Sequence, residues 1–244
     1  MTKEYTGPRI LYFDIETYGG LKAHMSEISM IGYKWAHEKE THVISGFDFP
    51  KEFKKDFADD KPVLKAFTAL VEQADVIIAH YGQKFDRCFI NSRIEKHGLP
   101  PLKPVRLIDT WRISKDNFAL QGNSLNVLLK FFNAPDQKVD LTYEEWRKVQ
   151  RGDLKSLKKL RDHCRNDVAG MAWIFENHLS HYTNYLPNHN LYKKDGVNGC
   201  PHCGSKDIRK KGFGYTRTAV TQQYQCKSCR RWSSALMTGK GKIR

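Results

Sequence analysis

The chain of 244 residues lacks any run of 18 apolar residues, so no membrane span is expected. Its first residues, MTKEYTGPR, lack the apolar core of a signal peptide, so we expect a cytoplasmic protein that is not secreted. Internal repeats and low-complexity tracts are also absent. The apolar fraction of 40% and the aromatic fraction of 12% are those of a globular protein. The length allows one good core, or one core and a small additional module.

Acidic residues are scarce near the C-terminus. Residues 193–244 contain 13 Lys and Arg against two acids, Asp195 and Asp207, a net charge of +11. The other 192 residues hold 28 basic and 25 acidic side chains, a net charge of +3. Concentrated positive charge indicates a polyanionic partner. A solubilising, disordered basic end is the alternative interpretation.

Apolar patterns predict a sheet followed by helices. Strands are predicted at residues 9–15, 27–35, 41–48, 76–80 and 105–109. Helices are predicted at residues 62–73, 84–97, 124–132, 142–148 and 153–178. This order predicts an α/β fold with a mixed five-stranded sheet flanked by helices. Because the composition shifts to Asn, Pro, Lys and Gly near Tyr182, we predict one domain over 1–181, a linker over 182–197 and a small module over 198–244.

Two acids stand on the first predicted strand. Asp14 and Glu16 are two residues apart in RILYFDIET, so their side chains point to the same face. The apolar residues before Asp14 favour a central strand. Burying two unpaired carboxylates would be costly, and bound metal ions would offset that cost. A solvated pair at a sheet edge is the alternative.

Two more acids and a histidine extend this pattern. Asp86 opens a predicted helix after the strand 76–80, near a strand end where sites gather in α/β sheets. Asp167 shares a helix face with His163, four residues before it. Carboxylates bind Mg²⁺ or Mn²⁺, and two such ions can clamp the attacking and leaving oxygens of a phosphodiester. Histidine can take a proton from an attacking water, although His163 could also be an ordinary surface residue. The pattern indicates a metal-dependent nuclease.

The segments DIET, GQKFD and H-x-x-x-D, in this order, resemble the motifs of the DEDD superfamily of 3′–5′ exonucleases, which have a DnaQ-like, ribonuclease H-like fold. The resemblance covers about residues 8–180 and is closest to the branch related to the proofreading domains of family B polymerases. SLNVLLKFFNAPDQK and CRNDVAGM also resemble that branch. The resemblance implies release of nucleoside 5′-monophosphates, with His163 orienting or deprotonating the attacking water. It implies that two Mg²⁺ or Mn²⁺ ions are held by Asp14, Glu16, Asp86 and Asp167.

The sequence departs from the family pattern at two places. Histidine stands four residues before Asp167, the spacing at which one subfamily has tyrosine, and Asp162 stands where the other subfamily has histidine. Tyr81 replaces the Asn that many relatives carry in the second motif. These departures leave the proton acceptor and the contact to the terminal nucleotide open. The expected substrate contacts in this domain are Thr17, Tyr81 and Phe85. Packing in the core is the alternative for Phe85, and Asp109 is expected to be structural or to support the metal ligands from behind.

Six cysteines occur, and four of them form two C-x-x-C pairs separated by 22 residues. The four are Cys200, Cys203, Cys226 and Cys229. Each C-x-x-C pair can form a tight turn, here called a knuckle, that offers two thiolates to a metal. Two such knuckles favour one tetrahedral Zn²⁺ ion, with a redox dithiol as the alternative. Gly204 follows the first knuckle, where a positive φ is often needed. Cys88 and Cys164 stand alone and are expected to be small buried hydrophobes.

The cysteine module resembles the zinc ribbons of transposase-associated and transcription proteins over residues 198–235. The segment IRKKGFGYTRTAVTQQYQ predicts two hairpin strands between the knuckles. A module this small has little core, so zinc would supply its folding energy. Phosphate and base contacts are expected from Lys210, Lys211, Tyr215, Arg217, Arg230, Arg231 and Trp232. A structural or protein-binding ribbon is the alternative.

The expected partner is nucleic acid, as a single strand or the 3′ end of a duplex, with DNA favoured over RNA. A replication or recombination partner is not identified. The combination of an exonuclease domain and a ribbon suggests a phage or mobile-element protein, acting in the cytoplasm of a bacterial or phage-infected cell. A transposase- or resolvase-type endonuclease on the same fold and a non-catalytic nucleic-acid-binding protein are the alternative functions.

Overall fold

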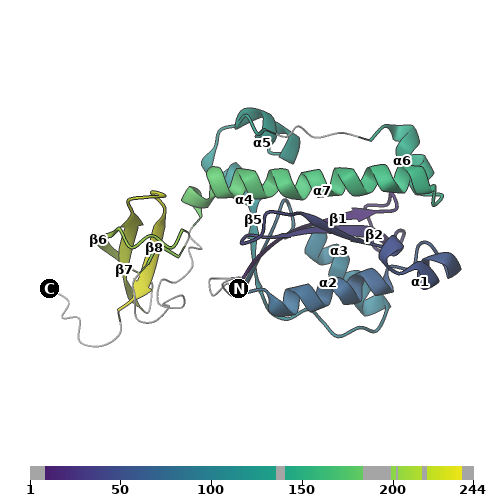
Figure 1. The fold of residues 1–244 in the computed structure, drawn as a ribbon, viewed down its shortest axis with the longest axis horizontal. Coiled ribbons are helices and arrows are strands. Elements are labelled where there is room, and N and C mark those ends of the chain that lie inside the picture. Colours follow the sequence, from purple (N-terminus) through teal and green to yellow (C-terminus); the bar gives the residue numbers. More distant parts are fainter. Residues whose placement is uncertain (1–8, 136–140, 184–198, 202, 216–218, 238–244) are drawn as a thin grey trace. The chain divides into compact units, whose positions relative to one another are not determined.

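The computed structural model describes residues 9–135, 141–183, 199–201, 203–215 and 219–237 (Figure 1). The chain divides into two compact units, one of which is Arg9–Leu179, and the other contains the C-terminal part from Ser180 onward. The predicted linker over 182–197 falls almost entirely on residues 184–198, which lie outside the described residues. The division of the chain into domains over 1–181 and 198–244 therefore stays a prediction.

The first unit contains the predicted mixed sheet of five strands. The strands are β1 (Ile10–Thr17), β2 (Ile28–Trp35), β3 (His42–Ser45), β4 (Val76–Ala79) and β5 (Arg106–Asp109). Their order is β3-β2-β1-β4-β5, so β1 is the central strand, as its apolar sequence predicts. β1 pairs antiparallel with β2 and parallel with β4, and β4 pairs parallel with β5.

Seven α-helices of this unit lie in the described residues. They are α1 (Pro50–Lys55), α2 (Lys61–Gln73), α3 (Asp86–Lys96), α4 (Thr110–Asn117), α5 (Leu125–Phe131), α6 (Tyr143–Val149) and α7 (Leu154–Asn177). Short 3₁₀ helices, η1 (Gly46–Asp48) and η2 (Leu179–Tyr182), follow β3 and α7. The predicted helices are confirmed, whereas α1 and α4 have no counterpart among the predictions.

Local capping explains where several helices begin. Ser124 accepts a hydrogen bond from the Val127 amide at 3.4 Å, and Asp153 accepts one from the Ser156 amide at 2.8 Å. Thr142 forms a capping box with Glu145 at the start of α6. Each cap satisfies amides that the first helical turn leaves without a partner. These polar residues thus fix the starts of α5, α6 and α7.

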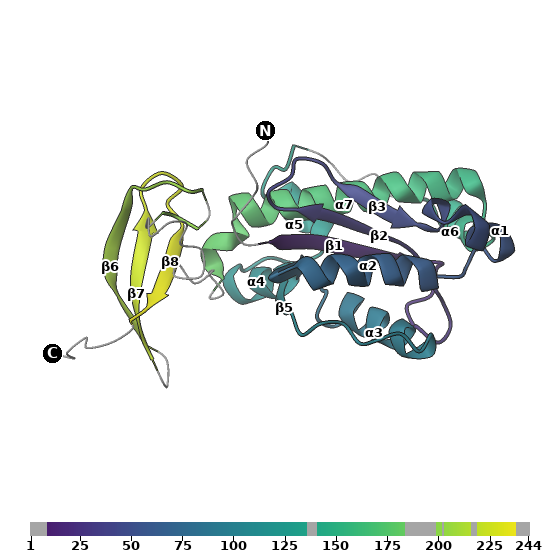
Figure 2. The same cartoon turned by 60° about the horizontal axis from the view of Figure 1, so that its bottom comes forward.

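Helices cover both faces of the sheet. Figures 1 and 2 show α7 along one face and α2 and α3 along the other. Side chains of β1 alternate accordingly: Leu11, Phe13 and Ile15 lie in a core cluster with residues of α2 and α3. Tyr12 lies in a second cluster with residues of α7. Because alternate strand residues share a face, Asp14 and Glu16 follow Tyr12 and face α7.

A buried ion pair anchors α3 beside the connection from β1 to β2. The Arg93 guanidinium, 2% exposed, binds both carboxylate oxygens of Asp60 at 2.7 and 2.9 Å. Asp60 also accepts from the Ile28 amide at 2.9 Å, and Arg93 donates to the Ala23 carbonyl at 3.2 Å. This pair joins the residue before α2 to α3 and to the start of β2.

The second unit contains a separate three-stranded antiparallel sheet. Its strands are β6 (Ile208–Tyr215), β7 (Val220–Cys226) and β8 (Trp232–Leu236), in the order β6-β7-β8. The predicted hairpin is confirmed as β6 and β7, and β8 adds a strand beyond it. Throughout the described ranges of both units, no helix has the length and apolar character needed to cross a bilayer.

Candidate functional site

Three of the predicted site residues share a small buried space between β1 and α7. The His163 Nε2 atom lies 3.6 Å from a Glu16 oxygen and 3.7 Å from an Asp167 oxygen. All three residues are at most 9% exposed. Asp14 is half-buried, and one of its oxygens lies within 4.8 Å of a Glu16 oxygen. Glu16 and His163 are therefore interior residues. Their burial contradicts the two alternatives, a solvated carboxylate pair at a sheet edge and an ordinary surface histidine.

Asp86 reaches the same strand through a backbone hydrogen bond. The pairing of β1 with β4 ends at Tyr12 and Ile78, and further along β1 the Ile15 amide donates to Asp86 Oδ1 at 3.2 Å. Asp86 therefore lies beside the backbone that separates Asp14 from Glu16. Burial raises the pKa of the Asp86 carboxyl to about 7, with backbone hydrogen bonds opposing the shift and the charge of Asp109 adding to it.

Cys164 fills the space between α7 and the carboxylates. Its Sγ atom lies within 4.8 Å of an oxygen of Asp14 and of Glu16. Burial, followed by the charges of Glu16, Asp14 and Asp167, raises the pKa of this thiol well above its usual value. A neutral, buried thiol behaves as a small hydrophobe, as predicted. The same prediction is wrong for Cys88, which is exposed, because α3 buries residues 86, 89, 90, 93 and 94 on its opposite side.

Asp162 stands on α7 where the other DEDD subfamily has its histidine, but its side chain is directed to solvent. The Asp162 side chain is 69% exposed and pairs with Arg165 at 2.7 Å. His163 is thus the residue that α7 presents to the carboxylates at this level. Phe85 is half-buried, packs near Phe89 and joins the core cluster, while the Thr17 hydroxyl donates to the Gly20 carbonyl at 2.9 Å.

Asp109 holds together the two loops that follow β4 and β5. Its carboxylate accepts from the amides of Tyr81, Gln83 and Trp111 at 3.0, 3.1 and 3.0 Å. The structural role predicted for Asp109 agrees with these bonds. Tyr81 has a φ of 61° and is 40% exposed, and its ring lies 5.0 Å from that of Trp111. Sequence reasoning missed Trp111, although LIDTW places an indole directly after the acid at a strand end.

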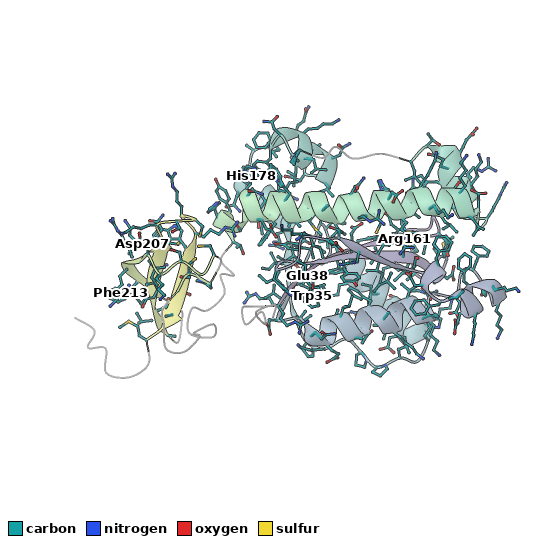
Figure 3. All side chains as sticks on the ribbon, in the orientation of Figure 1. Trp35, Glu38, Arg161, His178, Asp207 and Phe213 are labelled. Carbon is teal, nitrogen blue, oxygen red and sulfur yellow. The ribbon has the colours of Figure 1, made fainter. Side chains whose placement is uncertain are left out.

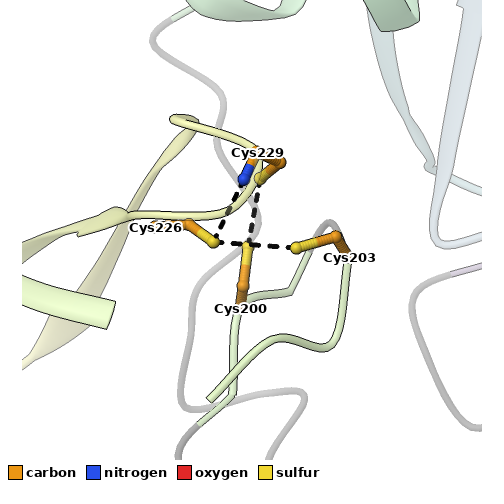
Figure 4. A group of neighbouring side chains, drawn as sticks. All are labelled: Cys200, Cys203, Cys226 and Cys229. Atoms are coloured by element: carbon orange, nitrogen blue, oxygen red, sulfur yellow. Dashed lines mark hydrogen bonds between the residues drawn. The ribbon is translucent and has the colours of Figure 1, made fainter. Parts of the chain in front are cut away.

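The four predicted cysteines form one cluster in the second unit (Figure 4). Cys200 and Cys229 sulfurs lie 3.6 Å apart, and so do those of Cys203 and Cys226. Tetrahedral Zn–S bonds of about 2.3 Å place sulfurs roughly 3.8 Å apart, so the cluster fits that geometry. Burial raises the pKa of Cys229, whereas that of Cys226, despite burial, is lowered to about 6 by backbone and thiol hydrogen bonds.

Backbone geometry supports both knuckles. Gly204, after the first knuckle, has a φ of 70°, as predicted. Arg230 occupies the equivalent position after the second knuckle and has a φ of 61°. The amide of Cys226 donates to the Arg231 carbonyl at 2.9 Å, and that of Cys200 donates to the Ser205 carbonyl at 2.7 Å. These turns direct the four sulfurs toward a common centre.

The predicted nucleic-acid contacts of this unit are partly on the surface. Lys210, Lys211 and Arg230 are exposed, whereas Arg231 and Trp232 are half-buried. Phe213, labelled in Figure 3, is 51% exposed on the same strand as the two lysines. The Tyr215 side chain and Arg217 lie outside the described residues. The exposed set therefore combines basic side chains with one aromatic ring.

Comparison with known proteins identifies the first unit. A family model described as the RNase_H superfamily matches residues 11–179. The chain belongs to this superfamily. It is 27% identical over 150 residues to a DNA polymerase from Thermococcus litoralis, a match that covers 56% of this chain and 9% of the polymerase. The chain therefore spans only a small part of that relative.

The solved structure of the family B DNA polymerase from the archaeon Pyrobaculum calidifontis has a similar fold. The TM-score is 0.56 at 16% sequence identity, over 86% of this chain and 31% of the polymerase chain. The predicted ribonuclease H-like fold is confirmed. Residues 11–179 thus form an RNase H-like nuclease domain, followed in the chain by the small sheet with its four-cysteine cluster.

Proposed function

We propose that this protein is a 3′–5′ exonuclease that hydrolyses phosphodiester bonds and releases nucleoside 5′-monophosphates. The observation that carries this proposal is that Asp14, Glu16 and Asp167 lie together at one end of β1, with Asp86 hydrogen-bonded to the β1 backbone between Asp14 and Glu16. Asp14 and Glu16 come from β1, Asp86 from the start of α3 and Asp167 from α7. The motif order resembles that of DEDD exonucleases, and the superfamily membership supports a nuclease.

The donor set fits hard divalent ions. Mg²⁺ and Mn²⁺ prefer carboxylate oxygens, and buried carboxylates that are close together repel one another without a cation. Asp14, Glu16, Asp86 and Asp167 would hold two such ions. When bound, the ions would activate a water and stabilise the leaving 3′ oxygen.

We assign the role of proton acceptor at this site to His163. Its Nε2 atom lies 3.6 Å from a Glu16 oxygen and 3.7 Å from an Asp167 oxygen, next to the carboxylates that would hold the ions. A neutral imidazole there can take the proton of the attacking water, and the adjacent carboxylates stabilise the imidazolium that forms. The surrounding burial restricts other water molecules near this nitrogen.

We further propose that the four-cysteine cluster binds one structural Zn²⁺ ion and that this ribbon assists binding to nucleic acid, with DNA favoured over RNA. The sulfur spacing and the lowered pKa of Cys226 support zinc, since thiolates are its ligands. Exposed basic side chains on β6 support the contact to phosphates. Reduced cysteines of this kind also favour an intracellular location.

The decisive experiment compares mononucleotide release by the intact chain and by Asp14→Ala and Asp86→Asn variants. Substrates are end-labelled single- and double-stranded DNA and RNA, with and without Mn²⁺. We expect metal-dependent release from 3′ ends by the wild type and its loss in both variants. Asp162→Asn is the matched control, because Asp162 is exposed next to His163. Full release by both site variants refutes the proposal, and cleavage of a circular single strand supports an endonuclease instead.

A further inference from the structure

An aromatic pair lies on the surface of the nuclease domain, next to the helix that begins with Asp86. The rings of Tyr81 and Trp111 are 5.0 Å apart with an interplanar angle of 72°. Tyr81 is 40% exposed, and Trp111 is half-buried. Both contribute to a pocket of about 340 Å³. That volume falls in the roughly 300–1,000 Å³ range typical of ligand sites.

The charges around the pair favour a polyanion. Lys84 and Lys115 are exposed lining residues, and the Lys115 ammonium lies 4.9 Å from the Trp111 ring centroid. Of the two acids in the lining, Asp109 is 8% exposed and engaged by backbone amides, and Asp116 pairs with Arg112 at 3.4 Å. The lining thus holds three cations, Lys84, Arg112 and Lys115, against two acids, and presents a net positive charge to a ligand.

The backbone connects the pair firmly to the carboxylate cluster. The Lys84 and Phe85 amides donate to the Tyr81 carbonyl at 3.2 and 3.1 Å, and the next residue, Asp86, begins α3. Asp109 ties this turn to Trp111 on α4. Because β1, β4 and β5 run parallel, the loops after β4 and β5 lie at the same sheet edge as the end of β1, where Glu16 stands.

The positive φ of Tyr81 also indicates a site that is held in place. A φ of 61° is uncommon for a bulky residue and is maintained here by the hydrogen bond from the Tyr81 amide to Asp109. The result is an exposed phenol ring next to an indole, a lysine above the indole, and little freedom in the backbone. Aromatic rings with interspersed cations are the usual means of binding unpaired bases.

We propose that Tyr81 and Trp111 form a stacking site for an unpaired nucleobase of the substrate strand, with Lys84 and Lys115 contacting its flanking phosphates. This inference rests on the proposed exonuclease function and specifies its substrate as a single strand at this point. A base inside a duplex has both faces covered by its neighbours, so only an unstacked base can lie on these rings.

The experiment uses the full chain and 3′-terminal oligonucleotides that carry 2-aminopurine at each of the last few positions in turn. EDTA prevents hydrolysis. We expect the wild type and Trp111→Phe to quench the fluorescence of 2-aminopurine at one of these positions. With Trp111→Ala, the fluorescence at that position should not be quenched. Tyr81→Asn is a second variant, because Asn tolerates a positive φ. Phe131→Ala, at a 52% exposed ring on α5, is the matched control.

If Trp111→Ala removes the stacking contact of one base, its KM with Mn²⁺ should rise roughly 5- to 150-fold while kcat stays unchanged. Quenching that persists in both Trp111→Ala and Tyr81→Asn at every position overturns the stacking site. The two proposals fail separately: quenching without any mononucleotide release refutes the exonuclease alone, and release without position-specific quenching refutes the stacking site alone.

Discussion

Gly32 on β2 lies against Cys164 on α7 so closely that a Cβ atom at residue 32 would stand 2.8 Å from the cysteine sulfur. It would also stand 2.8 Å from a methyl carbon of Val168. Gly32 is the pairing partner of Asp14 across the β1–β2 ladder. The missing side chain therefore lets α7 approach the sheet at the carboxylate cluster, where His163 and Asp167 meet Glu16.

Gly32→Ala is expected to displace α7 and to weaken both the fold and the reaction. Overpacking of this kind costs about 1–3 kcal/mol of unfolding free energy. Urea unfolding and mononucleotide release measure the two effects. Gly122→Ala is the control, because a Cβ atom there would find its nearest neighbour at an ordinary 3.7 Å. Wild-type stability and activity in Gly32→Ala would show that α7 does not need this close approach.

The sequence predicted the central part of this site because its signals are local. The apolar run before Asp14 predicts a central strand, and the i, i+4 spacing of His163 and Asp167 predicts a shared helix face. The close approach at Gly32 depends on two elements far apart in sequence, so no local pattern reports it. The polar α1 has no buried residue, and α4 buries Thr110, Ile113 and Ser114, so neither has an apolar periodicity to detect.

Asp60→Asn is expected to destabilise the nuclease domain strongly. The change removes the negative charge that pairs with the Arg93 guanidinium, which is 2% exposed. Breaking a buried ion pair by removing one partner costs about 3–5 kcal/mol of unfolding free energy. The other carboxylate near Arg93, that of Glu27 at 3.4 Å, is 30% exposed and compensates only part of the charge. Urea unfolding measures the loss, with Asp116→Asn as the control, since its pair with Arg112 is exposed and worth at most about 1 kcal/mol. Equal effects of the two substitutions would contradict a special role for the buried pair.

The raised pKa of Asp86 predicts that the stability of the metal-free protein depends on pH. Its pKa is raised from 3.8 to about 7 on folding, so the folded state favours the protonated carboxyl. The stabilising contribution of this proton is complete below about pH 4, the usual range for an aspartate, and is lost as the pH rises through 7. Asp86→Asn, which does not titrate, should therefore gain stability relative to the wild type between pH 4 and pH 8.

Thermal unfolding in EDTA tests this difference, and Mn²⁺ supplies the complementary measurement. The cation should raise the melting temperature of the wild type more than that of Asp86→Asn, because it compensates the carboxylate charge. Asp162→Asn, at an exposed carboxyl, is the control for a general charge effect. A difference in melting temperature between wild type and Asp86→Asn that does not change with pH would contradict the raised pKa.

Cys226→Ser is expected to remove zinc and unfold the three-stranded sheet while leaving the nuclease domain folded. Zinc supplies most of the folding energy of so small a module. Metal analysis should find about one zinc ion per wild-type chain and much less in the variant. Calorimetry should show the loss of one transition only. Cys88→Ser, at an exposed thiol of α3, should change neither result. Retention of zinc by Cys226→Ser would contradict a four-cysteine site.

Substitution of the exposed lysines of β6 distinguishes a ribbon that binds nucleic acid from one that is purely structural. Lys210 and Lys211 are exposed, in the part of the chain where positive charge is concentrated. If each contacts a phosphate, Lys210→Gln and Lys211→Gln should each reduce the slope of log Kd against log salt concentration by about 0.7–0.9, because fewer counterions are released. Lys65→Gln on α2 of the nuclease domain is the matched control, since Lys65 is also exposed. Binding of labelled single-stranded DNA across a salt series measures the slope. An unchanged slope in both ribbon variants would assign the ribbon a structural or protein-binding role, because phosphate contacts cannot be removed without losing their counterion release.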